Sequence, residues 1–219
     1  AQIKFGVEKE NIFASKPLEY TVKIDLTENY NFNDIFIQNI YNFLDKEVFS
    51  YRHQSLLTNG KQTAGNFFLK EESYIKEIER IIRFEIDKYR SKFSNSHEGF
   101  LINWPKDFYL KGWLINMRSG GKLDPHMHDN GWISGAVYIN IPNKKELNSG
   151  NFVVTTDEKI TSKDNNHNQE KNIDVKKVSK MIDVRTGSLV LFPSSLMHYT
   201  IPFESDENRI VLAFDVVPK

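Results

Sequence analysis

The stretch Trp132-Ile-Ser-Gly-Ala-Val-Tyr-Ile-Asn-Ile141 indicates the fold class of this chain. It is short, rich in β-branched and aromatic residues and followed by a proline, which is the pattern of a buried β-strand. Similar stretches occur around it, at 108–117, 151–155, 188–192 and 209–217. Several short strands with no helical period between them are typical of a β-sandwich or a β-barrel.

The part of the chain before these strands has a different pattern. Apolar residues at helical spacing predict amphipathic helices over 33–48 and 75–93. The stretch 50–66 between them is polar and contains glycine, which predicts a loop. We therefore expect helices to flank a mainly β core.

A polar insertion interrupts the β-rich part at about residues 156–180, where Lys, Asp, Asn and Glu are dense and apolar residues are few. We interpret it as a long exposed loop. A length of 219 residues is within the range of one β-rich domain. We expect a single domain over 1–219, in which 1–105 is a helix-containing support region and 106–219 is the β core.

The composition excludes several classes of function. Lys plus Arg and Asp plus Glu both number 29, so the formal net charge is zero, which argues against general binding of nucleic acids or anionic membranes. No apolar run approaches the roughly 20 residues that span a bilayer, and the first residues lack the basic-then-apolar layout of a secretory signal. We expect a cytoplasmic protein, and the oligomeric state stays open.

The chain contains no cysteine, which removes disulfides, thiolate nucleophiles and iron–sulfur clusters together. Any metal site must therefore use nitrogen and oxygen ligands. The six histidines are the imidazole donors that remain. Some of these histidines can be metal ligands, and the others are expected to be ordinary surface residues.

His126 and His128 stand one residue apart, just after Gly120, Gly121 and Pro125. On an extended strand, residues two positions apart project from the same face, so both imidazoles can converge on one point. Imidazole binds iron, copper, nickel and zinc. A His-x-His pair alone more often marks two surface histidines than a metal site, so the pair needs a further ligand.

A further histidine, His198, follows the strand-like stretch Gly187-Ser-Leu-Val-Leu-Phe-Pro193, and Arg209 opens the apolar stretch 210–214. An arginine there either reaches solvent or is held inside by an anionic partner. Beside a metal, a guanidinium would bind a carboxylate ligand through two parallel hydrogen bonds. The other histidines lie in polar stretches and are expected at the surface: His53, His97 and His167.

Taken in order, these motifs resemble the iron(II)- and 2-oxoglutarate-dependent oxygenases. The order is His-x-His, then the Ser-Gly-x-x-Tyr strand at 134–138, then Gly-x-Leu-Val-Leu-Phe-Pro-Ser before His198, then Arg-Ile-x-x-x-Phe at 209–214. The chain is most similar to a branch of these oxygenases with a His-x-His metal motif. The resemblance covers about residues 112–217, and each motif is modest, but four motifs in the right order are specific.

The resemblance implies a double-stranded β-helix, the jelly-roll or cupin-like fold, with the metal inside one mouth of the barrel. It implies Fe(II), 2-oxoglutarate and O2 as cofactor and co-substrates, with 2-oxoglutarate decarboxylated to succinate while an unidentified small-molecule or peptide substrate is oxidised, most simply hydroxylated. Carried over to this chain, His126 and His198 would be metal ligands, and Arg209 would bind the distal carboxylate of 2-oxoglutarate. It further implies helpers for the co-substrate at Tyr138 and Asn116, and pocket-lining side chains at Trp113, Met117 and Trp132.

One position departs from the wider superfamily, which has an aspartate two residues after the first histidine. Here that residue is His128, so the site would hold three neutral imidazoles and one more unit of positive charge than the usual triad. We expect His126, His128 and His198 to bind the metal together. Alternatives are a site in which His128 points elsewhere, or one completed by the adjacent Asp129, although on a strand Asp129 would face the other way.

Two other functions remain open at this point. One is a three-histidine, cupin-like metal protein that binds its substrate directly and does not use 2-oxoglutarate. The other is a non-catalytic barrel that serves as a binding module. Arg209 separates the oxygenase from the first alternative, because only the oxygenase needs it to form succinate.

Overall fold

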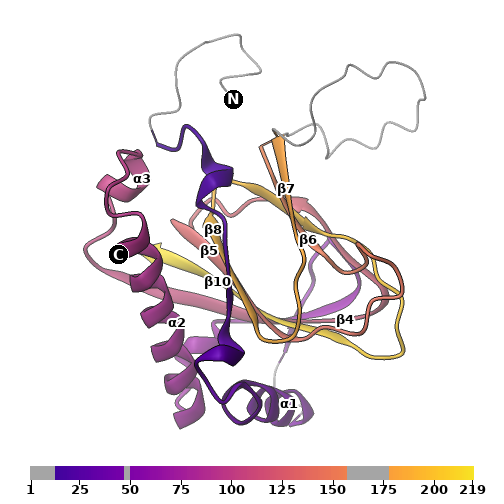
Figure 1. The fold of residues 1–219 in the computed structure, drawn as a ribbon. Helices are drawn as coiled ribbons and strands as arrows, with labels where there is room; N and C mark the ends of the chain where they lie inside the picture. Colours follow the sequence, from indigo (N-terminus) through magenta and orange to yellow (C-terminus); the bar gives the residue numbers. More distant parts are fainter. Residues whose placement is uncertain (1–12, 47–49, 157–177) are drawn as a thin grey trace, which may run out of the picture.

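The computed structural model describes residues 13–46, 50–156 and 178–219. Within these ranges, ten strands form one antiparallel sheet that closes almost completely on itself (Figure 1). The strands are β1 (Val22–Asp25), β2 (Tyr51–Arg52), β3 (Leu57–Thr63), β4 (Phe108–His126), β5 (Ile133–Asn140), β6 (Phe152–Thr155), β7 (Ser179–Ile182), β8 (Ser188–Pro193), β9 (Met197–Thr200) and β10 (Arg209–Pro218). The helices are α1 (Gln38–Asp45), α2 (Ser73–Lys92) and α3 (Gly99–Ile102). The expected jelly-roll fold, mainly β with flanking helices, is confirmed.

The sheet runs in the order β1-β8-β5-β10-β4-β9-β6-β7, and β3 adds to β4. The long strand β4 joins the two layers, because its first half pairs with β10 and its last residues pair with β9. Two successive glycines, as at Gly120 and Gly121, are typical of a turn, but the strand continues through both. Gly120 has a φ of 72°, and a Cβ on Gly121 would lie 2.6 Å from the carbonyl oxygen of Arg118, so the two glycines allow a bend within the strand.

Side chains of β4 and β10 alternate between two environments, as the pleat of a strand requires. In β10 and in residues 108–117 of β4, the even-numbered residues pack against the helices, in a core that contains Leu110, Leu114, Ile210, Leu212, Phe214 and Val216. Odd-numbered residues face the inside of the barrel and line a cavity. Figure 1 shows α1 and α2 on one side of β5, β8 and β10, with β6 and β7 on the other side.

The predicted helix over 75–93 is confirmed as α2, whose apolar stripe is buried against the sheet. The predicted helix over 33–48 is shorter, because α1 begins at Gln38 after a π-helical turn at Asn33–Ile37. The prediction of a loop over 50–66 is wrong. This stretch holds β2 and β3, and β3 is a polar strand that forms by pairing with β4 rather than by burying an apolar face.

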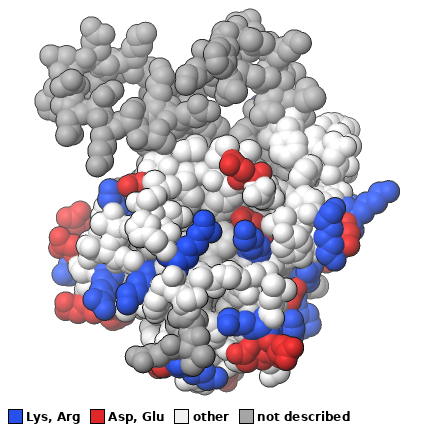
Figure 2. Space-filling model, turned by 180° about the vertical axis from the view of Figure 1, so that it is seen from behind, with Lys and Arg blue, Asp and Glu red and all other residues white. Residues whose placement is uncertain are grey.

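Most of the polar insertion at 156–180 lies outside the described residues, although its last residues, Ser179 and Lys180, begin β7. No helix within the described parts of the chain is long and apolar enough to cross a membrane. Lysine and arginine side chains are interspersed with aspartate and glutamate on the face seen in Figure 2.

Candidate metal and co-substrate site

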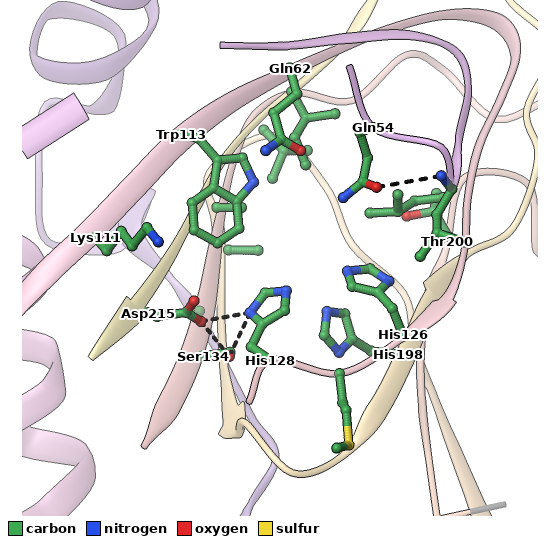
Figure 3. Close-up of a pocket in the computed structure, with 18 of the residues that line it drawn as sticks. Gln54, Gln62, Lys111, Trp113, His126, His128, Ser134, His198, Thr200 and Asp215 are labelled. Atoms are coloured by element: carbon green, nitrogen blue, oxygen red, sulfur yellow. Dashed lines mark hydrogen bonds and ion pairs between the residues drawn. The ribbon is translucent and has the colours of Figure 1, made fainter. Parts of the chain in front are cut away.

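A cavity of about 570 Å³ opens inside the barrel. Its walls are the odd-numbered side chains of β10 and of the first half of β4, His126 at the end of β4 and the even-numbered side chains of β5, together with parts of β3, β8 and β9. Figure 3 shows the three histidines at one end of this cavity, with Trp113 and Gln62 toward the other. The volume lies in the range of small-molecule sites, and the mixture of apolar walls and a few polar groups is typical of such sites.

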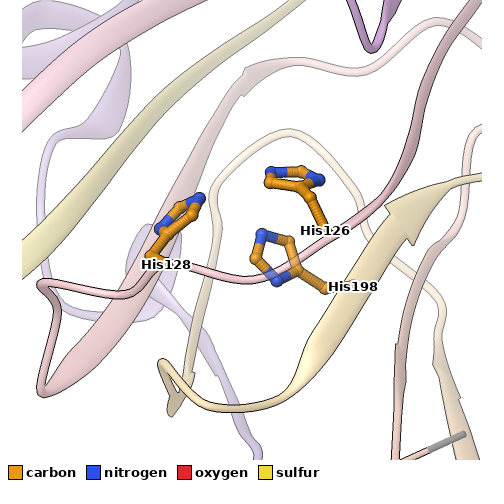
Figure 4. Close-up of side chains that lie close together, drawn as sticks. All are labelled: His126, His128 and His198. Carbon is orange, nitrogen blue, oxygen red and sulfur yellow. The ribbon is translucent and has the colours of Figure 1, made fainter. Parts of the chain in front are cut away.

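The imidazoles of His126, His128 and His198 converge in this cavity (Figure 4). His126 of β4 and His198 of β9 are register partners, which brings their ring centroids to 4.2 Å. His128 follows β4, and its ring centroid lies 5.2 Å from that of His126 and 4.8 Å from that of His198. One ligand atom from each residue lies within 4.8 Å of the others, so the cluster can hold one metal ion.

Backbone carbonyls fix two of the rings. The Nδ1 of His126 is 2.9 Å from the carbonyl oxygen of Asp124, and the Nδ1 of His198 is 3.1 Å from that of Leu196. A carbonyl oxygen only accepts hydrogen bonds, so the hydrogen of each ring is on Nδ1. The Nε2 atoms of both rings therefore carry the lone pairs that a metal needs.

His128 is fixed by a carboxylate instead. Its Nδ1 lies 2.6 Å from Oδ1 of Asp215 and 3.1 Å from Oγ of Ser134. Ser134 donates to the same Asp215 oxygen at 2.7 Å. His128 thus points into the cluster, as one of the expected arrangements requires, whereas Asp129 is exposed and is not among the clustered ligand groups.

Burial controls the charge of these rings. It lowers the pKa of His126 to about 4, with a further lowering from the nearby His128. Burial lowers the pKa of His198 well below its ordinary value, and proximity to His126 and His128 adds to this. Both rings are therefore neutral near pH 7, which is the form that binds metals.

Arg209 lies at the start of β10 and is only 2% exposed. Its Nη1 lies 3.9 Å from Sδ of Met117, and its guanidinium carbon lies 5.2 Å from the centroid of the Tyr138 ring. Its Nε and Nη2 are buried and have no hydrogen-bond partner among the described residues. Burial lowers the pKa of Arg209 and raises that of Tyr138. A buried guanidinium that lacks an acid is suited to an anionic ligand.

The other residues that the resemblance implied for the pocket fall into two groups, those that line the cavity and those that lie outside it. Trp113, Met117 and Tyr138 line the cavity. Asn116 does not, because it is the register partner of Ile210, on the helix-facing side of β4. Trp132 packs against the helix-facing core and donates from Nε1 to the carbonyl oxygen of Phe100 at 2.8 Å. Strand alternation places Asn116 outside the cavity, and Trp132, which precedes β5, is held outside it by its packing against the helix-facing core and its bond to Phe100.

The structure describes two of the three histidines that were expected at the surface. His53 and His97 are exposed, and His167 lies outside the described residues. Sequence reasoning missed Asp215, Ser134, Gln54 and Gln62, which also line the cavity. A signal for Asp215 exists: it lies an even number of residues after Arg209 on one strand, and so faces the same side. No comparable signal points to Gln62 on β3 or to Gln54 before it, because no strand was expected in this stretch.

A jelly-roll barrel that encloses three clustered histidines and a buried arginine without an acidic partner is suited to hold a metal ion and an anionic ligand together. Residues 111–215 match the model of a family described as "Putative 2OG-Fe(II) oxygenase". The segment contains the three histidines, Arg209 and Asp215. No curated protein matches the chain.

Several solved structures share the fold of this chain. A prolyl hydroxylase from Trichoplax adhaerens, in complex with a peptide of hypoxia inducible factor, is similar with a TM-score of 0.59 at 14% identity, over 99% of this chain and 92% of that chain. A prolyl-4-hydroxylase from Pseudomonas putida gives 0.59 at 11% identity, over 91% and 92%. HygX from Streptomyces hygroscopicus, with nickel and 2-oxoglutarate bound, gives 0.54 at 9% identity, over 97% and 87%.

Proposed function

We propose that this protein is an Fe(II)- and 2-oxoglutarate-dependent dioxygenase that hydroxylates a small-molecule or peptide substrate. His126, His128 and His198 would hold the iron through Nε2, and Arg209 would bind the distal carboxylate of 2-oxoglutarate. Cytoplasmic location and the lack of a nucleic-acid or membrane partner stay predictions from the sequence.

The unpaired guanidinium of Arg209 is the observation that carries this proposal. A buried cation with two unsatisfied nitrogen atoms costs several kcal/mol unless an anion pairs with it. Among the described residues no carboxylate is hydrogen-bonded to it. A dicarboxylate that bridges the metal and Arg209 would satisfy the guanidinium, and this explains why a cation is buried in a metal-binding cavity.

The donor set fits the metal. Neutral imidazole suits Fe(II), and the Nδ1 bonds hold each ring with Nε2 available. Bound Fe(II), 2-oxoglutarate and O2 supply the oxidising chemistry, in which the co-substrate becomes succinate and a substrate C–H bond becomes C–OH. The protein contributes binding, orientation and exclusion of water.

Other side chains of the cavity contribute to binding, orientation and exclusion of water. The Tyr138 ring packs against the Arg209 guanidinium and restricts where the co-substrate carboxylate can lie. Apolar side chains between Arg209 and the rim keep the interior dry: Ile115, Val211 and Ala213. Trp113, Gln62 and Lys111 surround the other part of the cavity in Figure 3, where a substrate would approach the metal.

Anaerobic addition of Fe(II) and then 2-oxoglutarate tests the proposal. We expect a visible metal-to-ligand charge-transfer band that saturates with 2-oxoglutarate. Arg209→Met should weaken 2-oxoglutarate binding by roughly 100-fold or more, because removing one partner of a buried ion pair costs about 3–5 kcal/mol. Lys111→Met is the matched control, since it removes an exposed cation of the same cavity and should leave the affinity for 2-oxoglutarate unchanged.

Two other results of this experiment would each favour a different function. Fe(II) binding without any band, and with no effect of Arg209→Met, would favour a three-histidine metal protein that does not use 2-oxoglutarate. No binding of Fe(II) and no consumption of O2 would favour a non-catalytic binding module. Hydroxylation itself is tested by mass spectrometry of candidate substrates, where a gain of one oxygen atom with succinate formed in equal amount is expected.

A further inference from the structure

We infer that Asp215 is a positioning residue which, through His128, supplies the negative charge that a carboxylate ligand gives the metal in the wider superfamily. This inference rests on the proposed function, because it assigns a role toward the metal of that same site. His128 stands where the superfamily has an aspartate ligand. The chain would keep the charge but place it behind the imidazole instead of on the metal.

The acceptors behind the three rings differ in one respect. His126 and His198 donate from Nδ1 to backbone carbonyls, which are neutral. Only His128 donates to a carboxylate, and this is the shortest of the three bonds, at 2.6 Å. The single charged acceptor therefore stands behind the single ring that replaces a charged ligand.

The surroundings of Asp215 are built for this contact. The residue is 6% exposed and lies on the cavity-facing side of β10. Ser134 donates to Asp215 Oδ1 at 2.7 Å and is itself 2.8 Å from Oγ of Ser194, so two strands and a loop fix the carboxylate. The described residues place no lysine or arginine in an ion pair with it. Lys111, its register partner on β4, forms no ion pair with it, so among the described residues His128 is its ion-pair partner.

The consequence is electrostatic as well as geometric. A hydrogen bond from an imidazole to a carboxylate makes the opposite nitrogen a stronger electron donor and fixes the plane of the ring. Both effects favour a divalent ion, and the charge favours the trivalent state more than the divalent state. Three imidazoles alone would leave the site one unit more positive, so loss of Asp215 should weaken metal binding and raise the reduction potential.

Asp215→Asn isolates the charge, because the amide oxygen still accepts the hydrogen bond of His128. We expect Co(II) and Fe(II) to bind about tenfold more weakly to D215N, and up to about 100-fold more weakly to D215A, which also loses the orientation of the ring. The Fe(III)/Fe(II) potential of the metal-loaded protein should become more positive in D215N. Both measurements are made without 2-oxoglutarate, by competition with a chelator and by anaerobic redox titration.

Glu85→Gln is the matched control. Glu85 is another fully buried carboxylate, bonded to Tyr30 and Lys88 in the helical layer, so E85Q can lower stability but should leave metal affinity and potential unchanged. Ser134→Ala removes a hydrogen bond to Asp215 but keeps its charge, and should change affinity less than D215N does. Circular dichroism confirms that each variant is folded.

A double-mutant cycle with His128→Gln tests the route through His128. If Asp215 acts through that ring, adding D215N to H128Q should cost less than about threefold in metal affinity, well below its effect in the wild-type protein. The double variant H128Q/D215N also provides a test if D215N alone does not fold. It places two amides side by side and leaves no isolated buried carboxylate.

The outcomes separate the two proposals. Wild-type protein that binds metal, while D215N binds it equally well and at an unchanged potential, would overturn the role of Asp215 and leave the oxygenase intact. An equal cost of D215N with and without His128 would overturn the route through that ring. Wild-type protein that binds neither Fe(II) nor Co(II) would overturn the proposed function and this inference together.

Discussion

The two faces of strand β10 have opposite tasks, although they alternate along one ten-residue segment. The helix-facing side consists of Ile210, Leu212, Phe214 and Val216, all buried in the main core. The cavity-facing side begins with Arg209 and includes Asp215, which are buried and polar. The helix-facing side therefore stabilises the fold, whereas the cavity-facing side lowers its stability, because burying charged groups costs free energy.

The difference explains why the register of this strand must be specific. A slip by one residue would turn every side chain to the opposite face. Arg209 and Asp215 would then press into the apolar helical layer, and Phe214 would enter the cavity. Pairing of β10 with both β4 and β5 holds the register, and Gly135 makes room for the Phe214 ring, since a Cβ there would lie 2.2 Å from it.

The largest effect is expected on the helix-facing side. Phe214→Ala should lower the free energy of unfolding by about 3–5 kcal/mol, because it removes a fully buried ring and leaves a cavity beneath the helices. Urea unfolding measures the loss. Protein that remains folded should bind metal as the wild type does, since the ring faces away from the site.

Val217→Ala provides the comparison on the other face of the same strand, where the side chain is only half-buried at the cavity edge. We expect it to cost less than about 1 kcal/mol. A loss for Val217→Ala as large as that for Phe214→Ala would contradict the division of the strand into a stabilising and a functional face.

Substitution of Arg209 should raise the stability of the fold instead of lowering it. In protein without metal or 2-oxoglutarate, Arg209→Met should raise the free energy of unfolding by about 1–3 kcal/mol, because a buried guanidinium without an acid is replaced by an apolar chain of similar length. The exposed Arg185, which pairs with Asp183 at 3.3 Å, is the control: Arg185→Met should change stability by less than about 0.5 kcal/mol. Destabilisation by Arg209→Met would mean that the guanidinium is paired after all.

Much of this division was predictable from sequence, because strand alternation and helical spacing are local signals. The stripe of α2 and the strands β5, β8 and β10 follow from apolar patterning, and the order of the motifs indicated the metal ligands. Assigning a face was harder. Asn116 and Trp132 were expected in the cavity because they lie near site residues along the chain. The pleat of β4 turns Asn116 toward the helices, and Trp132, just before β5, bonds to Phe100 in the helical layer.

Other features depend on contacts that no local pattern encodes. The polar strand β3 forms because β4 offers it an edge, so its own residues carry no apolar alternation. The bond between Asp215 and His128 joins residues that are 87 positions apart, and only the antiparallel packing of the sheet brings them together. The acceptors of the other two imidazoles are carbonyls, which any sequence would supply.

A smaller effect is expected from pH, on the cavity side and in metal-free protein. Burial holds the pKa of His126 near 4 in the folded protein, below the ordinary value of 6.5 that applies when the chain unfolds. The unfolded chain therefore binds the proton first as the pH falls, so stability is lost progressively below about pH 6.5 and the loss ends below about pH 4. Between about pH 7 and about pH 5 this histidine should account for on the order of 1–2 kcal/mol.

His126→Gln should remove that part of the slope when unfolding is followed in the presence of a chelator. The buried His198 has a lowered pKa as well and leaves a slope of the same sign. His97→Gln is the matched change at an exposed histidine, and should leave the slope as it is in the wild type. Equal slopes for His126→Gln and the wild type would show that His126 is not desolvated.

The smallest change distinguishes two tryptophans that the sequence grouped together. The Trp113 ring lies 5.4 Å from the His128 ring, whereas Trp132 packs with its Nε1 bonded to Phe100 in the helical layer. Binding of Co(II) should quench tryptophan fluorescence, because quenching by a bound paramagnetic ion falls steeply with distance, and Trp113 should account for most of the loss. Trp113→Phe should therefore keep less than half of the quenching, while Trp132→Phe keeps most of it and affinity changes in neither. If Trp132→Phe removed the larger share, the metal would lie behind the sheet rather than in the cavity, and the division between the two faces would fail.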